Sequence, residues 1–287
     1  MIIMKKICLF LILLLLLLSG CSKAESFQIA ASTLPVYEFT TILCEGTNIS
    51  VSRLITEEVS CLHDYTLQVK QMRAVESADV VILNGGGLED FLTDVLINAD
   101  RVIDASKDLE LSCGHHHEGH QHAHDPHIWL SPEKAKQMSQ AIFEELSNLY
   151  PSHREQFAVN LTVLFAKLDA LQAYGETELQ HLQTRNLITF HDGFTYFAES
   201  FGLHILKAVE EESGSEVSAK ELIEIIDLVN LNQLPAIFTE TNGSTAAAKV
   251  ISAETGTNIY KLDMAMAGDS YFDAMYHNIR TVKEALE

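Results

Sequence analysis

The middle of the chain reads PSHREQFAVNLTVLFAKLDALQAYGETELQHL over residues 151–182. Its large apolar residues recur every three or four positions, as they do along one face of an α-helix: Phe157, Leu161, Leu164, Leu168 and Leu171. A helix of about 30 residues would be roughly 45 Å long, because each residue adds about 1.5 Å. We therefore predict one long helix that connects two lobes.

On both sides of this helix, short apolar runs alternate with amphipathic stretches. The runs predict strands at 27–32, 49–55, 79–84, 101–105, 186–190, 203–209, 234–240 and 257–263. Alternating β and α elements are typical of a parallel sheet covered by helices. The predicted fold class is α/β, with two such lobes, one long joining helix and a ligand site in the cleft between them. The expected boundaries are 27–150 for the first lobe, 151–183 for the linking helix and 184–287 for the second lobe.

The N-terminus has the features of an export signal. Met1–Lys6 contains two lysines, Ile7–Leu18 is an apolar run of twelve, and Ser19, Gly20 and Cys21 follow. Twelve apolar residues are too few to span a bilayer, and this order is that of a secretory signal. The ending LLSGC resembles the bacterial lipoprotein signal, in which the cysteine is lipidated. We predict a signal peptide at 1–20 and a lipid-anchored tether at 21–26; the alternative is a simple cleaved or uncleaved anchor.

The chain is strongly acidic. It has 40 Asp and Glu against 19 Lys and Arg, a formal net charge of −21. Removing the two signal lysines gives −23, which is 17 basic minus 40 acidic residues. This balance argues against nucleic acid, whose binding proteins need basic patches. It suits an exported protein with a cationic ligand, but it does not identify that ligand.

Residues 114–130 read GHHHEGHQHAHDPHIWL, and seven of the chain's 13 histidines lie between His115 and His127. Neutral imidazole is a preferred ligand of zinc and similar metals, so the tract indicates a transition metal. We predict a His-rich loop at 113–126 whose histidines collect metal: His115, His116, His117, His120, His122 and His124. The alternative is a disordered, solvated insertion that has no effect on function.

Four polar residues follow or end predicted strands or lie in the loops after them. His63, His127, His191 and Asp263 occupy these positions, two in each half. Ligands bind beyond the carboxyl ends of parallel strands, so the four side chains are expected to meet. Three imidazoles and a carboxylate can complete a tetrahedral zinc site, although a single such histidine is more often structural. Neighbouring acids could orient the three rings: Asp64, Asp125 and Asp192.

Several segments together resemble the zinc and manganese solute-binding lipoproteins of bacterial ABC importers: TLPVYEF, LHDYTLQVKQMRAVESADVVILNG, LEDFL, DPHIWLSP, ITFHDGFTYFAESFGL, SAKELIEII, AIFTE and GDSYFDAMYHNI. The likeness runs from about Phe27 to the C-terminus. It implies two α/β lobes, a rigid linking helix and one metal in the cleft, held by His63, His127, His191 and Asp263. Manganese members tend to have a glutamate where this chain has His191, and many zinc members have a His-rich loop. The resemblance therefore favours Zn²⁺, with Mn²⁺ as the alternative.

The resemblance also implies the partners and the location. The implied partners are an ABC permease with its ATPase subunit, and the membrane, to which the lipid anchor attaches the protein. The protein is expected to be extracytoplasmic and a monomer. The stiff helix implies small lobe tilts on metal release. This chain departs from the family at Ser60-Cys61-Leu62, where small residues and a proline are usual. Because the fourth position varies in this family, Asp263, water or Cys61 could be the fourth ligand.

Three cysteines remain after Cys8 in the signal and the lipidation candidate Cys21. In an exported protein they allow one disulfide. Cys44 ends a helix on the side away from the cleft, while Cys61 and Cys113 follow strands at the cleft side. A disulfide needs Cα atoms within about 7 Å, so we expect a Cys61–Cys113 bond and a buried Cys44 thiol.

Two other functions are compatible with parts of this pattern. A zinc hydrolase keeps three protein ligands and an open position, which three histidines without Asp263 would imitate. The chain has no HExxH pair, so no enzyme is expected. A surface adhesin role could coexist with transport, and no residue distinguishes it.

Overall fold

The computed structural model describes residues 27–57, 62, 65–112, 124–209 and 217–287. It contains two four-stranded sheets in which every strand pair is parallel. The first sheet has the order β2-β1-β3-β4 and the second β6-β5-β7-β8. The strands are β1 (Phe27–Ala31), β2 (Ile49–Arg53), β3 (Val80–Leu83), β4 (Val102–Asp104), β5 (Asn186–Thr189), β6 (His204–Ala208), β7 (Ala236–Glu240) and β8 (Asn258–Leu262). All the predicted strands are therefore confirmed.

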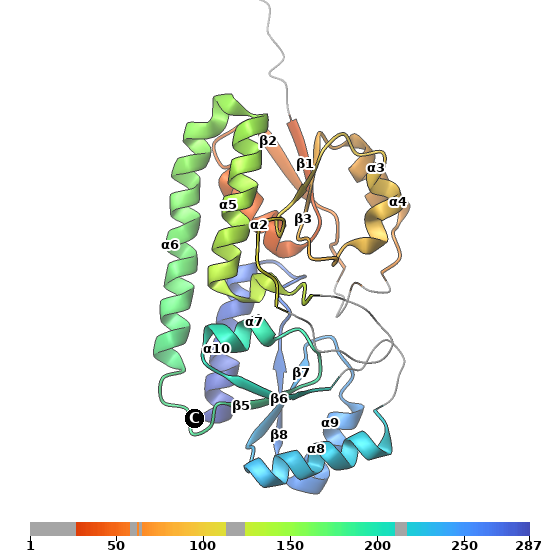
Figure 1. Ribbon diagram of the computed structural model, residues 1–287, viewed down its shortest axis with the longest axis vertical. Helices are drawn as coiled ribbons and strands as arrows, with labels where there is room; N and C mark the ends of the chain where they lie inside the picture. Colours follow the sequence, from red (N-terminus) through yellow and green to blue (C-terminus); the bar gives the residue numbers. More distant parts are fainter. Residues whose placement is uncertain (1–26, 58–61, 63–64, 113–123, 210–216) are drawn as a thin grey trace, which may run out of the picture.

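Helices cover both sheets (Figure 1). They are α2 (Leu34–Leu43), α3 (Val69–Ser77), α4 (Thr93–Leu96), α5 (Pro132–Leu149), α6 (Arg154–Glu178), α7 (Thr195–Ser200), α8 (Ala219–Asn232), α9 (Ala246–Thr255) and α10 (Tyr271–Leu286), with 3₁₀ turns η1 (Asp90–Leu92), η2 (Ile128–Leu130) and η3 (Pro151–His153). We call the β1–β4 sheet with its helices the first lobe and the β5–β8 sheet with its helices the second lobe. The two-lobe α/β fold class is confirmed.

Helix α6 is the predicted linking helix. It has 25 residues, which corresponds to about 37 Å, and it runs beside α5 along both lobes (Figure 1). Its predicted apolar face is buried. The helix is shorter than the predicted 151–183, since it begins at Arg154 and ends at Glu178. Tyr150 leaves helical geometry before Pro151, as residues preceding a proline tend to do. Pro151 then begins η3 instead of the helix.

The segment after β8, residues 263–270, ties the second lobe to the first. The Met266 carbonyl accepts the Leu34 N–H at 3.2 Å, and the Gly268 carbonyl accepts Arg53 Nη1 at 2.7 Å. At the start of α10, the Tyr271 N–H donates to Glu38 Oε2 of α2 at 2.6 Å. These bonds cross between the lobes and hold them in one arrangement.

The largest apolar core is shared by both lobes. One cluster of buried side chains contains Phe39 of the first lobe together with Trp129, Leu262 and Met275. A smaller cluster lies in the second lobe and includes Ile225 of α8. Because apolar burial contributes about 25 cal/mol per Å², separating the lobes would expose much of the shared core at a high cost.

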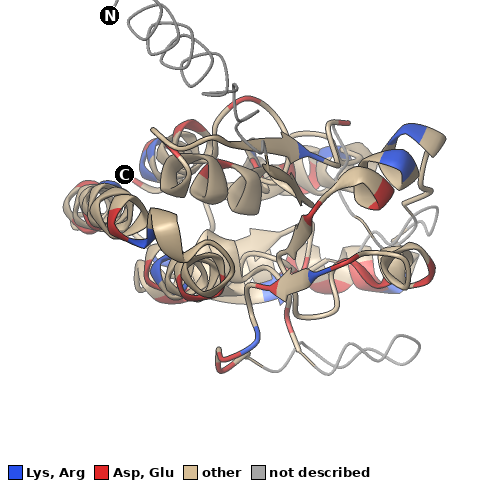
Figure 2. Cartoon of the chain, turned by 90° about the horizontal axis from the view of Figure 1, so that it is seen from above, with Lys and Arg blue, Asp and Glu red and all other residues tan. Residues whose placement is uncertain are grey.

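The described residues contain no helix that is both long and apolar enough to cross a membrane. The predicted signal and tether at 1–26 lie outside the described residues. Figure 2 shows that acidic residues are spread over the described part of the chain, interspersed with Lys and Arg.

Candidate metal site

His127 lies where the first lobe meets the second. It directly precedes η2, and its side chain is buried with 5% of the residue exposed. One carboxylate oxygen, Asp125 Oδ1, accepts the His127 backbone N–H at 2.9 Å and lies 2.7 Å from ring Nδ1. Burial alone would raise the pKa of Asp125, but the charge and hydrogen bonds of His127 outweigh it and the pKa is lowered. An ionised Asp125 therefore orients the His127 ring, as the sequence suggested.

His191 follows β5, two residues beyond its last residue, Thr189. The Thr189 hydroxyl donates to the His191 carbonyl at 3.0 Å, and ring Nδ1 lies 2.6 Å from Glu240 Oε1. Glu240 ends β7 and is 4% exposed. Burial would lower the pKa of His191, but the hydrogen bond and charge of Glu240 outweigh it and the pKa is raised. The carboxylate that orients His191 is thus Glu240, while Asp192 contributes its charge.

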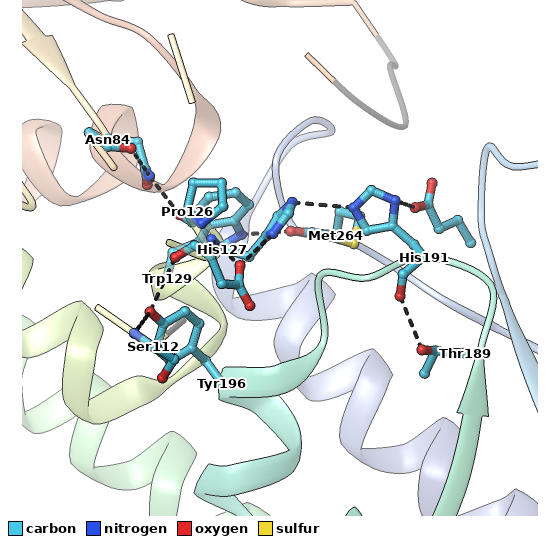
Figure 3. A network of polar contacts seen from close by, with 12 residues as sticks. Asn84, Ser112, Pro126, His127, Trp129, Thr189, His191, Tyr196 and Met264 are labelled. Carbon is cyan, nitrogen blue, oxygen red and sulfur yellow. Dashed lines mark hydrogen bonds and ion pairs between the residues drawn. The ribbon is translucent and has the colours of Figure 1, made fainter. Parts of the chain in front are cut away.

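The two rings point their Nε2 atoms at each other across the lobe boundary (Figure 3). The Nε2 atoms are 3.2 Å apart, and the ring planes are 87° apart. A neutral ring that donates from Nδ1 to a carboxylate has a lone pair on Nε2. Two such rings cannot hydrogen-bond to each other while both are neutral, so either a proton shared between the two Nε2 atoms or a bound cation would satisfy both lone pairs.

The separation of the two nitrogens suits a metal ion. Two nitrogens held at about 2.0–2.1 Å by one tetrahedral zinc lie about 3.3 Å apart. The Nε2 atoms of His127 and His191 are 3.2 Å apart before any ion is considered. Carboxylates on both Nδ1 atoms set the tautomer and orientation that zinc-bound histidines usually have.

Gly193 and Met264 border the His191 ring. A Cβ atom at Gly193 would lie 2.5 Å from His191 Cδ2 and 2.8 Å from Met264 Cε. Trp129 lies two residues after His127, and its indole N–H donates to the Met264 carbonyl at 2.7 Å (Figure 3). Met264 thus lies beside Gly193 and is bonded to the first lobe through its carbonyl.

Asp263 follows β8 and is half-buried. Its Oδ1 accepts the Ala265 N–H at 2.7 Å, and its backbone is bonded to the Asn278 side chain in both directions at 2.7 Å. Among the described residues, no group of three or more His, Cys, Asp or Glu side chains is arranged to hold a metal ion. Asp263 as a ligand therefore stays a prediction.

Several predicted residues lie outside the described part of the chain: His63, Asp64, Cys21, Cys61, Cys113, His115, His116, His117, His120 and His122. The disulfide and most of the collecting tract are therefore untested. Two positions after His63 in the sequence, Tyr65 donates from Oη to Glu57 Oε2 at 2.6 Å. His124 is exposed, next to Asp125. Cys44 is a buried free thiol, as expected, and burial raises its pKa to about 12.

Glu240 was missed by the sequence analysis. It is the last residue of AIFTE and of β7, so the strand-end rule that identified His191 also applies to it. No residue next to Glu240 in the sequence indicated its role, because the His191 ring that it contacts is 49 positions away. Only the order of β5 and β7 in the sheet brings them together.

Residues 29–285 match the family described as zinc-uptake complex component A, periplasmic. The chain belongs to this family. The family supplies the extracytoplasmic metal-binding component of an uptake complex and is not an enzyme family. The zinc-binding lipoprotein AdcA of Streptococcus pneumoniae serotype 4 is 30% identical over 311 residues, covering 99% of this chain and 62% of AdcA. The chain thus spans less than two thirds of that relative's length.

Two solved structures show the same fold. A ZnuA deletion mutant with zinc bound has a TM-score of 0.78 and 29% identity, covering 92% of this chain and 99% of that one. The solute-binding protein FpvC of Pseudomonas aeruginosa in complex with Mn²⁺ also has a TM-score of 0.78, with 25% identity and coverage of 91% and 98%. The fold thus occurs with either metal, so the fold alone does not select between them.

Proposed function

We propose that this protein captures Zn²⁺ outside the cytoplasm and delivers it to the permease of an ABC importer, whose ATPase subunit powers uptake. The observation that carries the proposal is the convergence of His127 Nε2 and His191 Nε2 at 3.2 Å, with a carboxylate on each Nδ1. Membership of a zinc-uptake family supports it. In this proposal the chain binds and releases the ion and performs no covalent step.

The proposed ligands are His63, His127, His191 and Asp263, with water or Cys61 as alternatives at the fourth position. A set of three imidazoles and one carboxylate is the kind that zinc accepts in tetrahedral geometry. Manganese is better suited to sites rich in carboxylate and carbonyl oxygen. The ring at position 191 therefore favours zinc, and manganese is the second candidate because a manganese-bound relative shares the fold.

The histidines at 115–124 are proposed to collect metal near the site without being required for tight binding. A deletion mutant of ZnuA was crystallised with zinc bound, so a relative with this fold can lose a segment and still hold zinc, which supports the proposal. We further propose a monomer anchored through a lipid on Cys21, since the relative AdcA is a lipoprotein.

The experiment is metal content and calorimetric affinity for Zn²⁺ and Mn²⁺, measured on the exported chain and on three variants. We expect one tight zinc per chain in the wild type, in a chain lacking 115–124 and in the His153→Ala control, whose ring lies at the start of α6. We expect tight binding to be lost in His191→Ala, because one converging nitrogen is gone.

Two results would contradict the proposal. Loss of tight binding on deletion of 115–124 would place the site in the tract instead of between His127 and His191. Manganese bound as tightly as zinc, and found as the metal of the exported protein, would overturn the choice of metal. A higher affinity for zinc than for manganese would not by itself establish zinc as the physiological metal, because most nitrogen and oxygen sites prefer zinc to manganese.

A further inference from the structure

The Tyr196 hydroxyl joins the two lobes beside the candidate metal site (Figure 3). Tyr196 belongs to α7 of the second lobe and is 1% exposed. Its hydroxyl donates to the Asp125 carbonyl at 3.1 Å and accepts the Ser112 N–H at 2.8 Å. The Asp125 N–H in turn donates to the Ser112 carbonyl at 3.0 Å. The hydroxyl therefore holds two segments of the first lobe side by side.

Asp125 passes this constraint on to His127. Its backbone is held by Ser112 and Tyr196, and its carboxylate holds both the N–H and the ring of His127. From the first lobe, Asn84 Nδ2 donates to the Pro126 carbonyl at 3.0 Å. Residues 125–127 are thus fixed from both lobes, with Tyr196 supplying the hold from the second lobe.

Tyr196 is also close to His191 along the chain. Only four residues separate them, and Phe194 and Tyr196 are both fully buried. The segment that carries one imidazole therefore also carries the hydroxyl that fixes the segment of the other. Any displacement of α7 would move His191 and the anchor of His127 together.

We propose that Tyr196 is a positioning residue for metal capture, whose hydroxyl keeps His127 in register with His191 across the lobe boundary. This inference rests on the proposed function. Losing the hydroxyl would leave the Asp125 carbonyl and the Ser112 N–H without this partner and let the carboxylate of Asp125 shift. His127 would then meet the ion in a less favourable orientation, and the ion would dissociate faster.

The test compares Tyr196→Phe with Tyr174→Phe. Phenylalanine retains the buried ring at 196 and removes only the hydroxyl. Tyr174 is a half-buried residue of α6 that stacks edge-to-face on Tyr276, away from the two histidines. The measurements are the zinc dissociation rate by chelator competition, the visible spectrum of the Co²⁺-loaded protein, and the thermal unfolding of the metal-free protein.

We expect zinc to leave Tyr196→Phe about tenfold faster, at the lower end of what outer partners of metal ligands contribute. We also expect a changed Co²⁺ spectrum, because the orientation of one ligand ring changes. Tyr174→Phe should match the wild type in both. A purely structural role would lower the unfolding temperature of Tyr196→Phe and leave the rate and spectrum unchanged, and that result would overturn the inference. A wild type without a tight zinc would instead refute the proposed function and this inference with it.

Discussion

His127 and His191 are held in the same way although they come from different lobes. Each ring directs Nδ1 at a buried carboxylate, Asp125 or Glu240, and turns Nε2 toward the other ring. The sequence analysis identified both rings and Asp125, because the loops after predicted strands and the residues close to each histidine can be read from the sequence. Glu240 was not identified, since its role depends on the pairing of β5 with β7.

The close contacts between Gly193 and the His191 ring allow us to predict the effect of adding one methyl group at position 193. In Gly193→Ala the new Cβ would lie 2.5 Å from His191 Cδ2, so the ring must move. We expect zinc affinity to fall at least about tenfold, as for other disturbances of ligand orientation. Calorimetry checks this result. The control is Gly256→Ala, where the added Cβ meets nothing within 4 Å but φ is +76°. It should cost stability and leave zinc affinity unchanged; equal affinity losses in both variants would contradict the steric explanation.

Glu89 predicts a pH dependence of stability. Its buried carboxylate accepts Ser32 Oγ at 2.5 Å and the N–H groups of Asn84 and Gly85 at 2.8 and 3.0 Å. Burial raises its pKa from 4.5 to about 7, assisted by the charge of Asp104 and opposed by the three hydrogen bonds. Between these two values the folded chain keeps a proton that the unfolded chain has lost. The stability contributed is therefore full below pH 4.5 and declines as pH rises to about 7.

The measurement is the free energy of unfolding in urea at several pH values for wild type and Glu89→Gln. Glutamine does not titrate, so the wild type should lose up to about 3 kcal/mol relative to the variant between pH 4.5 and 7.5. The control Glu224→Gln alters a carboxylate on α8 whose side chain is half exposed. A difference between wild type and Glu89→Gln that did not change with pH would show that the carboxyl titrates normally.

At the scale of elements, the linking helix was predicted from its apolar spacing, but its ends lie at Arg154 and Glu178 and not at the predicted 151 and 183. The repeat from Phe157 to Leu171 marks the face that α6 buries against α2, α5 and α10. Its N-terminus at Arg154 depends on the conformation of Tyr150, which the apolar pattern does not encode. A polar residue in the same face, Asn160, had no assigned role until α2 was placed beside it.

The Asn160 side chain of α6 is hydrogen-bonded to the end of α2, and we expect these bonds to stabilise the fold. Its Nδ2 donates to the Leu43 and Glu45 carbonyls, both at 2.8 Å, at the C-terminal end of α2. Alanine would leave these carbonyls without that donor, so Asn160→Ala should lower the free energy of unfolding by about 1–3 kcal/mol. Urea unfolding measures it, with the exposed Asn230→Ala as control. Zinc affinity should not change, and a variant as stable as the control would show that water replaces the amide.

At the scale of the whole molecule, the lobes share one core and several bonds. Arg53, Glu38 and Leu34 of the first lobe all bond to residues 266–271 of the second. With α6 continuous along both lobes, a wide hinge opening would have to break these bonds and expose the shared core (Figure 1). Metal exchange is therefore expected to need small rearrangements near the ligands.

This rigidity predicts the outcome of solution scattering. The radius of gyration should be the same, within measurement error, for the metal-free and zinc-loaded wild type, because the shared core resists lobe separation. Small-angle X-ray scattering on both states measures it, and His191→Ala treated with the same zinc concentration controls for effects of the ion elsewhere. A compaction seen on zinc loading in the wild type and absent in the variant would mean that the lobes do close by a hinge.

The sequence by itself determined the alternation of strands and helices, the long central helix, the position of His191 just after a strand and that of His127 in the long loop after another. These follow from local periodicity and from the rule that parallel strands present their carboxyl ends at one edge. Only the tertiary structure decided that Glu240 orients His191, that Tyr196 anchors the segment of His127, and that the lobes share a core. Those contacts join residues 49, 71 and more than 200 positions apart, and their partners depend on strand order and helix packing.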